Sequence, residues 1–336
     1  MKTTHLTQEV TFFNSVKGIS NEKELRTFIP HYPKILDKRI QTTLDYFSLE
    51  FIQVATIAFL AMNSSDDVLT PLHINSDIKI QSNTQLSLNT SLSEHTQKNS
   101  TLNASLYFMT SGLGHGLRIN GFIRKHEQQL TFQIEAVYFH CARAAARADI
   151  WNASKSQTIT EENILHYSPF ALLKTMNIEG KTELSPRGDS AGFVKALSKN
   201  TLVLPERPGN KIAVSLRNIL TCSCIELLFL VPNSNQMLNI KGTAKVIVDQ
   251  TLLEKFAMNG KKPKTGILIK IEESQFKYSA TLEKSGMWET KNNIEKSSIT
   301  SFSKALSSHI NGIGLLGKTT NLIVDAVVKH DMKNLD

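Results

Sequence analysis

The residues best suited to chemistry stand close together in the second half of the chain. They form three motifs: SPRGD (185–189), ERPGN (206–210) and LRNIL (216–220). The first places an Arg and an Asp around a Gly, and the second adds an Arg beside a Pro-Gly turn. Arginine side chains and the first backbone amides of a helix both favour anions. The pattern predicts a phosphate-binding site, against the plainer alternative of two turns and a surface arginine cluster.

A second polar motif, YFHCARAAARADIW (138–151), lies in the first half. His140 and Cys141 are adjacent, so on a strand they point to opposite faces and cannot both ligate one metal ion. A zinc site would also lack its remaining ligands. We therefore predict no metal site.

These motifs lie within two internal repeats. The aligned pairs are IAFLAM (57–62) with FALLKT (170–175), VLTP (68–71) with ELSP (183–186), LRING (117–121) with LNIKG (238–242), and 138–151 with QFKYSATLEKSGMW (275–288). The matches are collinear and their offset grows along the chain. The second half carries an additional segment, 251–264, which accounts for most of the largest step. This pattern predicts an ancient duplication with insertions.

Each half is predicted to be mainly β. Short apolar strands alternate with Gly, Asn, Asp or Ser, at a spacing that favours a barrel or sandwich over βαβ units. Helical patterns occur at 21–26, 37–55, 210–220, 250–257 and in the tail from residue 301. The polar segment 91–102 is predicted to be a loop.

In this order, SPRGD, ERPGN, LRNIL, LLFLVP (227–232) and LNIKGTAKV (238–246) resemble the pyridoxamine 5′-phosphate oxidase-like FMN-binding family, in particular its flavoprotein branch. The resemblance covers 161–288 well and 35–151 weakly. The FHCARA motif, which in that branch stands near the C-terminus, occurs here in the first half.

The resemblance implies a six-stranded split β-barrel, two of which pair with FMN at their interface. It assigns one set of residues to the phosphate: Ser185, Arg187, Gly188, Arg207, Asn210, Lys211, Arg217 and Asn218. It assigns a second set to the partner side of the cofactor: His140, Cys141, Arg143, Arg147 and Trp151. His140 is the candidate catalytic residue, as a proton donor or substrate contact.

Each half lacks the motif that the other half carries. TPLHI (70–74) stands where the second half has SPRGD, and FKYSAT (276–281) stands where the first half has FHCARA. We therefore expect an internal pseudo-dimer of two tandem split barrels with a single flavin site. The expected domains are a degenerate repeat (1–152), an FMN-binding barrel (153–300) and a helical tail (301–336). The chain would be a monomer or a homodimer; alternatively, the second halves of two chains form the site.

The expected function is that of an FMN-dependent oxidoreductase with a small-molecule substrate or electron donor. Two alternatives stay open. One is a haem-binding or haem-degrading split barrel with His140, His309 or His330 as axial ligand. The other is a non-catalytic flavin-binding protein.

Charge and composition limit the partners. Lys and Arg number 38 and Asp and Glu 30, which gives a net charge of +8 that lies almost wholly in the second half. No basic stripe with interleaved aromatics suggests nucleic acid. The densest lysine cluster, 255–264, is interpreted as a solvated loop. The N-terminus has no secretory signal pattern and no apolar run is long enough to span a membrane, so we predict a soluble cytoplasmic protein.

Overall fold

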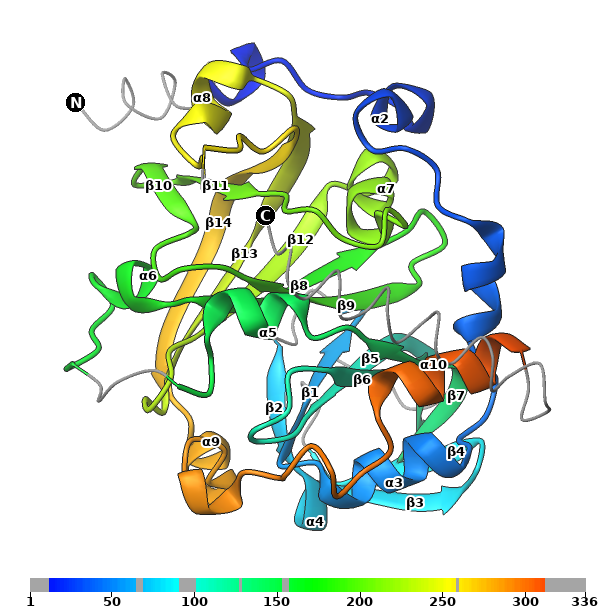
Figure 1. Cartoon of the computed structure of the whole chain (residues 1–336). Coiled ribbons are helices and arrows are strands. Elements are labelled where there is room, and N and C mark those ends of the chain that lie inside the picture. Colours follow the sequence, from blue (N-terminus) through cyan, green and yellow to red (C-terminus); the bar gives the residue numbers. More distant parts are fainter. Residues whose placement is uncertain are drawn as a thin grey trace.

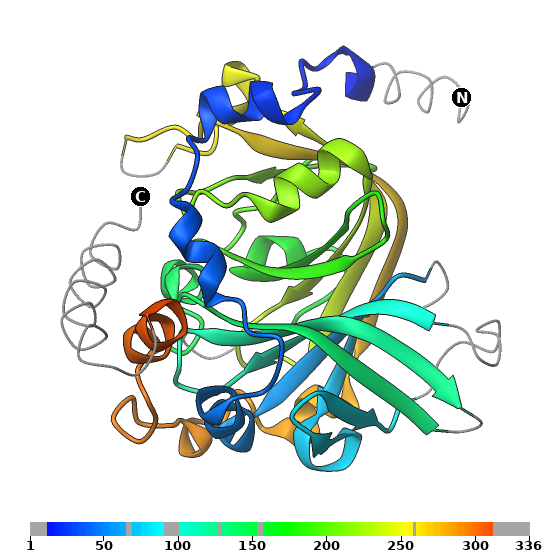
Figure 2. The same ribbon diagram turned by 90° about the vertical axis from the view of Figure 1, so that its right-hand side faces the viewer.

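The computed structural model describes residues 12–64, 69–90, 101–126, 129–152, 157–257 and 260–311. Two seven-stranded antiparallel sheets dominate it, one from each half of the chain. In Figure 2 the two sheets lie one above the other. The predicted mainly β architecture of tandem split barrels is confirmed.

The first sheet has the order β2-β1-β5-β6-β7-β4-β3. Its strands are β1 (Ile57–Met62), β2 (Thr70–His73), β3 (Ile78–Ser82), β4 (Gln85–Leu88), β5 (Thr101–Met109), β6 (Gly116–His126) and β7 (Gln129–His140).

The second sheet, β9-β8-β12-β13-β14-β11-β10, repeats that order strand for strand. Its strands are β8 (Phe170–Met176), β9 (Thr182–Gly188), β10 (Lys195–Ser198), β11 (Thr201–Pro205), β12 (Cys224–Leu230), β13 (Gln236–Ile247) and β14 (Gly266–Tyr278). The same sequence of pairings in both halves fits the duplication that the repeats predict.

A shared irregularity strengthens the match between the sheets. The register shifts after Asn120 in β6 and after Lys241 in β13, at equivalent points of the two hairpins. The residue that follows each shift is a glycine. A Cβ atom on Gly121 would collide with the carbonyl oxygen of Gln133, and one on Gly242 with that of Lys270. Glycine is required at both bulges because the partner strand lies so close.

Each sheet has seven strands where six were expected. The additional strands, β3 and β10, occupy equivalent positions at one edge of each sheet. Both are short, and most of their residues are exposed or only partly buried. β3 (IKIQS) shows only a brief apolar alternation and β10 (KALS) shows none, so neither strand has a strong pattern by which it is recognised in a sequence.

Helices cover the cores that the sheets enclose. They are α2 (Glu22–Phe28), η1 (Lys34–Arg39), α3 (Tyr46–Val54), α4 (Ile74–Asp77), α5 (Arg143–Ala148), α6 (Ile164–Tyr167), α7 (Val214–Thr221), α8 (Gln250–Glu254), α9 (Ala280–Ser285), η2 (Thr290–Asn292) and α10 (Phe302–Asn311). Phe51 and Ile52 of α3 join the first core, and Leu216 and Ile219 of α7 join the second.

A third core holds the two sheets together. It contains structurally equivalent residues from both halves, such as Phe59 of β1 and Leu172 of β8. The rings of Trp151 and Trp288 meet there with centroids 5.9 Å apart. Their indole N–H groups donate to the carbonyl oxygens of Leu113 (2.7 Å) and Ser234 (2.9 Å). This buried interface is what an internal pseudo-dimer requires.

The C-terminal helix α10 packs on the first half, beside η1 (Figures 1 and 2). His309 Nε2 lies 2.7 Å from Asp45 Oδ2, and Ala305 is buried in the first core. The predicted tail beyond residue 311, the N-terminal segment up to 11 and most of the predicted loop at 91–102 lie outside the described residues. Within the described ranges, no helix is long and apolar enough to cross a membrane.

Candidate functional site

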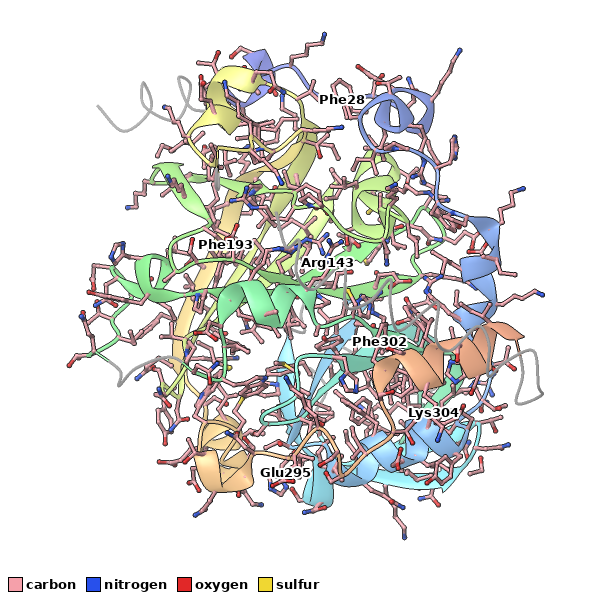
Figure 3. The ribbon with its side chains drawn as sticks, in the orientation of Figure 1. Phe28, Arg143, Phe193, Glu295, Phe302 and Lys304 are labelled. Atoms are coloured by element: carbon pink, nitrogen blue, oxygen red, sulfur yellow. The ribbon has the colours of Figure 1, made fainter. Side chains whose placement is uncertain are left out.

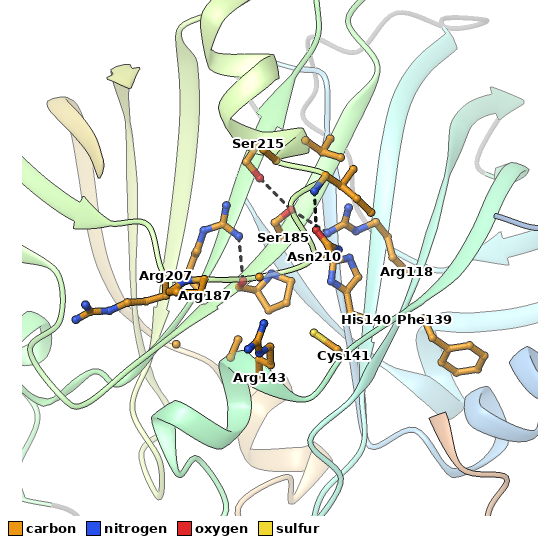
Figure 4. A pocket seen from close by; sticks show the side chains of 18 of the residues that line it. Arg118, Phe139, His140, Cys141, Arg143, Ser185, Arg187, Arg207, Asn210 and Ser215 are labelled. Carbon is orange, nitrogen blue, oxygen red and sulfur yellow. Dashed lines mark hydrogen bonds between the residues drawn. The ribbon is translucent and has the colours of Figure 1, made fainter. Parts of the chain in front are cut away.

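A cavity of about 390 Å³ lies where the two halves meet (Figure 4). One wall is the end of β7 with the start of α5, from the first half. The opposite wall is the end of β9 with the loop that joins β11 to α7, from the second half. The cavity thus joins the FHCARA, SPRGD and ERPGN motifs, which are widely separated in the sequence.

Apolar side chains from η1 and α10 close one side of this cavity. They are Leu36, Phe302, Leu306 and Ile310. Figure 3 shows Phe302 on α10 facing the central region that holds Arg143. A large organic ligand would therefore meet an apolar surface on this side.

Positive charge dominates the remaining lining. Six arginines take part: Arg39, Arg118, Arg143, Arg147, Arg187 and Arg207. Glu206 is the acidic residue among the lining side chains. Burial, and then repulsion from Arg143, lower the pKa of Arg147. Burial likewise lowers the pKa of Arg39, with Arg118 adding repulsion. Because these cations disfavour one another, an anion bound among them would be stabilised.

Arg118 links the two halves at the base of the cavity. Its side chain is 1% exposed and forms an ion pair with Glu183 of β9. It also donates to Tyr138 Oη (2.8 Å) and to Ser185 Oγ (2.9 Å). Burial alone would lower its pKa, but Tyr138 and Glu183 outweigh that effect and raise it. Arg118 is therefore a charged, fixed element of the wall.

Carboxylates orient the two arginines of the second half. Arg187 Nη2 lies 3.5 Å from Glu206 Oε2, and Arg207 forms an ion pair with Asp189, whose side chain is 1% exposed. Arg187 Nε is buried and has no hydrogen-bond partner among the described residues. These pairs hold both guanidinium groups at the cavity while Arg187 retains a donor for a ligand.

Gly188 has a structural reason to be glycine. A Cβ atom there would collide with the carbonyl oxygen of Ala144 in α5. The glycine thus lets α5 approach β9, and this approach brings Arg143 and Arg147 to the cavity.

His140 lies between Tyr107 and Tyr138, with ring centroids 5.7 and 5.8 Å away. Burial, and then the charges of Arg118, Arg39 and Arg187, hold its pKa well below the ordinary value. The imidazole is therefore neutral near pH 7. Its Nε2 is buried and has no hydrogen-bond partner in the described part of the chain. Such a ring can exchange a hydrogen bond with a ligand but supplies no positive charge.

The structure brings most of the predicted site residues to this cavity. Nine of them line it: His140, Cys141, Arg143, Arg147, Ser185, Arg187, Gly188, Arg207 and Asn210.

Four predicted residues lie elsewhere. Arg217 points to α2, where its Nε is 3.0 Å from Glu22 Oε1. Asn218 is buried and donates to Thr175 Oγ1 (3.0 Å). Trp151 packs against Trp288, and Lys211 lines a different cavity. These four residues therefore do not line the same cavity as the other nine.

Sequence reasoning missed several polar residues at the site, among them Arg39, Arg118, Tyr138, Glu183 and Ser215. Arg118 and Tyr138 are direct register partners on β6 and β7. The repeats contained a signal for Arg118, since LRING places an arginine where LNIKG has Asn239. No group of three or more His, Cys, Asp or Glu side chains in the described ranges could hold a metal ion.

The family model described as pyridoxamine 5′-phosphate oxidase matches residues 157–278. The resemblance inferred from the motifs is thereby confirmed for the second half. No curated protein matches the chain.

Solved structures with similar folds each cover about a third of this chain. HupZ from Group A Streptococcus is 18% identical, with 36% of this chain and 96% of that chain covered and a TM-score of 0.30. A protein related to general stress protein 26, of the pyridoxinephosphate oxidase family, from Clostridium acetobutylicum is 15% identical (35% and 84% covered, TM-score 0.26). The heme storage protein HutZ from Vibrio cholerae is 9% identical (35% and 90% covered, TM-score 0.26).

Proposed function

Starting from a chain whose residues 157–278 match the pyridoxamine 5′-phosphate oxidase family, we propose that the cavity between its halves binds FMN. The protein would then act as an FMN-dependent oxidoreductase on a small-molecule substrate or electron donor. The observation that carries this proposal is the convergence of six arginines from both halves on one cavity with an apolar side.

The residues present fit the chemical groups of FMN. Arg187 and Arg207 are suited to the phosphate because charge-assisted hydrogen bonds to phosphate are strong and directional. The buried, unpartnered Nε of Arg187 supports this assignment. The apolar side formed by η1 and α10 suits a flat ring system. FMN, when bound, would supply the redox chemistry.

The chain's own residues would position the cofactor and the substrate. The Arg118–Glu183 pair joins the two walls of the cavity and would help to hold them in place for a ligand. His140, being neutral, would act as a hydrogen-bond contact rather than as a strong proton donor. Excess positive charge would favour an anionic substrate or an anionic reduced ring.

Haem binding is the second candidate, and His140 is the residue that favours it. His140 lines the cavity, and a neutral imidazole is the form that ligates a metal, but its Nε2 is buried, so the side chain would have to turn toward the cavity to serve as an axial ligand. Of the other histidines considered, His309 contacts Asp45 and His330 lies outside the described residues.

Absorbance of the protein after incubation with each cofactor, followed by removal of unbound cofactor, tests these proposals. Retained bands in the near ultraviolet and blue support FMN, whereas a Soret band with no flavin bands would overturn it in favour of haem. Turnover of a reduced donor by the FMN-loaded protein then distinguishes an oxidoreductase from a non-catalytic flavin-binding protein.

A further inference from the structure

A second cavity, of about 520 Å³, adjoins the first. The loop that carries ERPGN separates them, and residues 206–210 and Ala213 line both. Its other walls come from residues 28–30 at the end of α2, from Lys211, and from 261–265 before β14. Figure 3 shows Phe28 in the upper part of the molecule, far from Phe302. Because the ERPGN loop forms a wall of both cavities, a ligand that extends across this loop could reach both of them.

Lysine side chains supply most of the positive charge that lines this second cavity. Lys211, Lys261, Lys262 and Lys264 line it together with Arg207. Lys262 is paired with Glu254 and Arg207 with Asp189, and Glu206 is paired with Arg187. Within the described residues, no carboxylate forms an ion pair with Lys211, Lys261 or Lys264. These three exposed lysines at the cavity therefore have no ion-paired carboxylate in the described part of the chain. Their charges are available to a ligand that carries several negative charges.

The cavity also has an apolar floor. Phe28, Ile29, Pro30 and Pro263 contribute to its walls. Free phosphate would make no use of such a surface, whereas a ligand with a ring and phosphates would use both parts of the lining.

The backbone between the two cavities is strained. Lys211 and Ala213 have φ angles of +62° and +56°, in the left-handed region that residues other than glycine rarely adopt. Arg26 of α2 holds this segment by donating to the carbonyl oxygens of Lys211 (2.8 Å) and Ile212 (3.3 Å). Strain of this kind concentrates at ligand-binding segments, where surrounding structure fixes the unusual conformation.

The first half has no equivalent of this lysine wall. There, β6 ends at His126 and β7 begins at Gln129, whereas β13 ends at Ile247 and β14 begins at Gly266. The inserted segment contains α8 and the three lysines of 261–264. The lysine cluster interpreted from the sequence as a solvated loop is therefore part of a cavity beside the proposed flavin site.

We propose that the second cavity binds the phosphates of a nucleotide co-substrate, whose redox-active ring enters the adjoining cavity. This inference rests on the proposed function, because it assigns the electron donor to the site beside FMN. The chemistry required is a nucleotide with two rings: phosphates that face the lysines, a base that lies on the apolar floor of the second cavity, and a separate redox-active ring that reaches the adjoining cavity.

Calorimetric titration with NADP+, on the full-length protein with and without FMN, tests the proposal. NADP+ has the required phosphates and does not reduce the flavin. We expect the Lys261→Gln/Lys264→Gln variant to bind NADP+ at least tenfold more weakly than the wild type, with unchanged FMN content. The control is Lys284→Gln/Lys291→Gln, which removes the same charge from α9 and η2 and should change the affinity less than twofold.

Equal affinities in wild type and Lys261→Gln/Lys264→Gln would overturn the inference, as would an absence of NADP+ binding to the wild type. Inorganic phosphate that binds within twofold of NADP+ would also overturn it, because the site would then recognise only a free anion. Lysine-dependent NADP+ binding by a protein that takes up no FMN would uphold the nucleotide site while refuting the proposed function. FMN uptake without lysine-dependent NADP+ binding would uphold the proposed function while refuting the nucleotide site.

Discussion

The pseudo-twofold relation of the two halves creates two equivalent interface regions, and they differ in charge. One is the arginine-lined cavity. Its counterpart combines β2 and α9 with the ends of β13 and β14. Strand registers align Arg118 with Asn239, Tyr138 with Gln275, and Arg187 with Leu72.

Local pairing satisfies the buried charges of the counterpart, although the side-chain oxygens of Asn239 and Gln236 are buried without a hydrogen-bond partner among the described residues. Leu69 donates its N–H to Glu226 Oε1 (2.6 Å) and accepts from Asn239 Nδ2 (3.3 Å). Glu226 also pairs with Lys174, 3.5 Å away, and both side chains are buried. The counterpart thus matches each buried charge with a partner, whereas the cavity gathers more cations than carboxylates. After a duplication, one interface region can become packing while the other retains the features of a binding site.

The largest expected effect comes from Arg118→Met. This change leaves the carboxylate of Glu183 partly buried without its cation, which costs about 3–5 kcal/mol. Its counterpart change, Asn239→Leu, removes one neutral hydrogen bond and should cost about 1 kcal/mol. Urea unfolding of both variants measures the difference. Equal losses of stability would show that the two regions are energetically alike.

Arg187→Ala tests the cavity as an FMN site. Loss of a charge-assisted hydrogen bond is worth about 1.5–3 kcal/mol, so the Kd for FMN should rise at least tenfold. Arg217→Ala is the matched control, since Arg217 faces Glu22 and its loss should leave the Kd unchanged. Fluorescence titration measures both. Arg207→Ala is a poorer test than Arg187→Ala, because it would leave the buried carboxylate of Asp189 without its cation.

His115 should make the stability of the first half depend on pH. Burial, and then the charge of Lys296, lower its pKa to about 4 from the usual 6.5. Between these values the unfolded chain binds a proton that the folded chain does not, so stability falls as the pH drops from about 6.5 to 4. The loss amounts to at most about 3 kcal/mol. His115→Gln, which introduces the residue type of its counterpart Gln236, should reduce the pH dependence of the unfolding curves by this amount, while the contribution of the buried His140 remains.

The smallest effect is expected at the counterpart region. Replacing the pair by Lys174→Met/Glu226→Gln should change the free energy of unfolding by about 1 kcal/mol or less, because no buried charge is left unpaired and the glutamine oxygen can still accept from the Leu69 N–H. FMN binding should stay the same. A second bound FMN in this variant, or loss of the first, would contradict the assignment of the region to packing.

The repeats predicted the tandem barrels because both halves keep the same strand order and the same glycine bulges. Side-chain directions were harder to predict. Arg217 follows Ser215 by two residues, which turns a helical side chain by about 200°. Ser215 therefore lines the cavity while Arg217 faces α2. The angle between these two side chains around the axis of α7 follows from their spacing in the sequence. Which face of α7 lies against α2 does not.

The missed residues depend on contacts between distant segments. Arg118 gains its role only because β9, 65 positions further on, places Glu183 beside it. The lysines at 261–264 line a cavity only because residues 28–30 pack opposite them. Neither pairing follows from local periodicity, which describes one element at a time.

Equilibrium dialysis of the full-length protein against FMN tests the central claim most directly. If one interface region binds the cofactor and its counterpart is packing, saturation should occur at one FMN per chain. Two FMN per chain would show that the counterpart also binds the cofactor. One FMN per two chains would show that the site forms between chains, and either result would contradict the account.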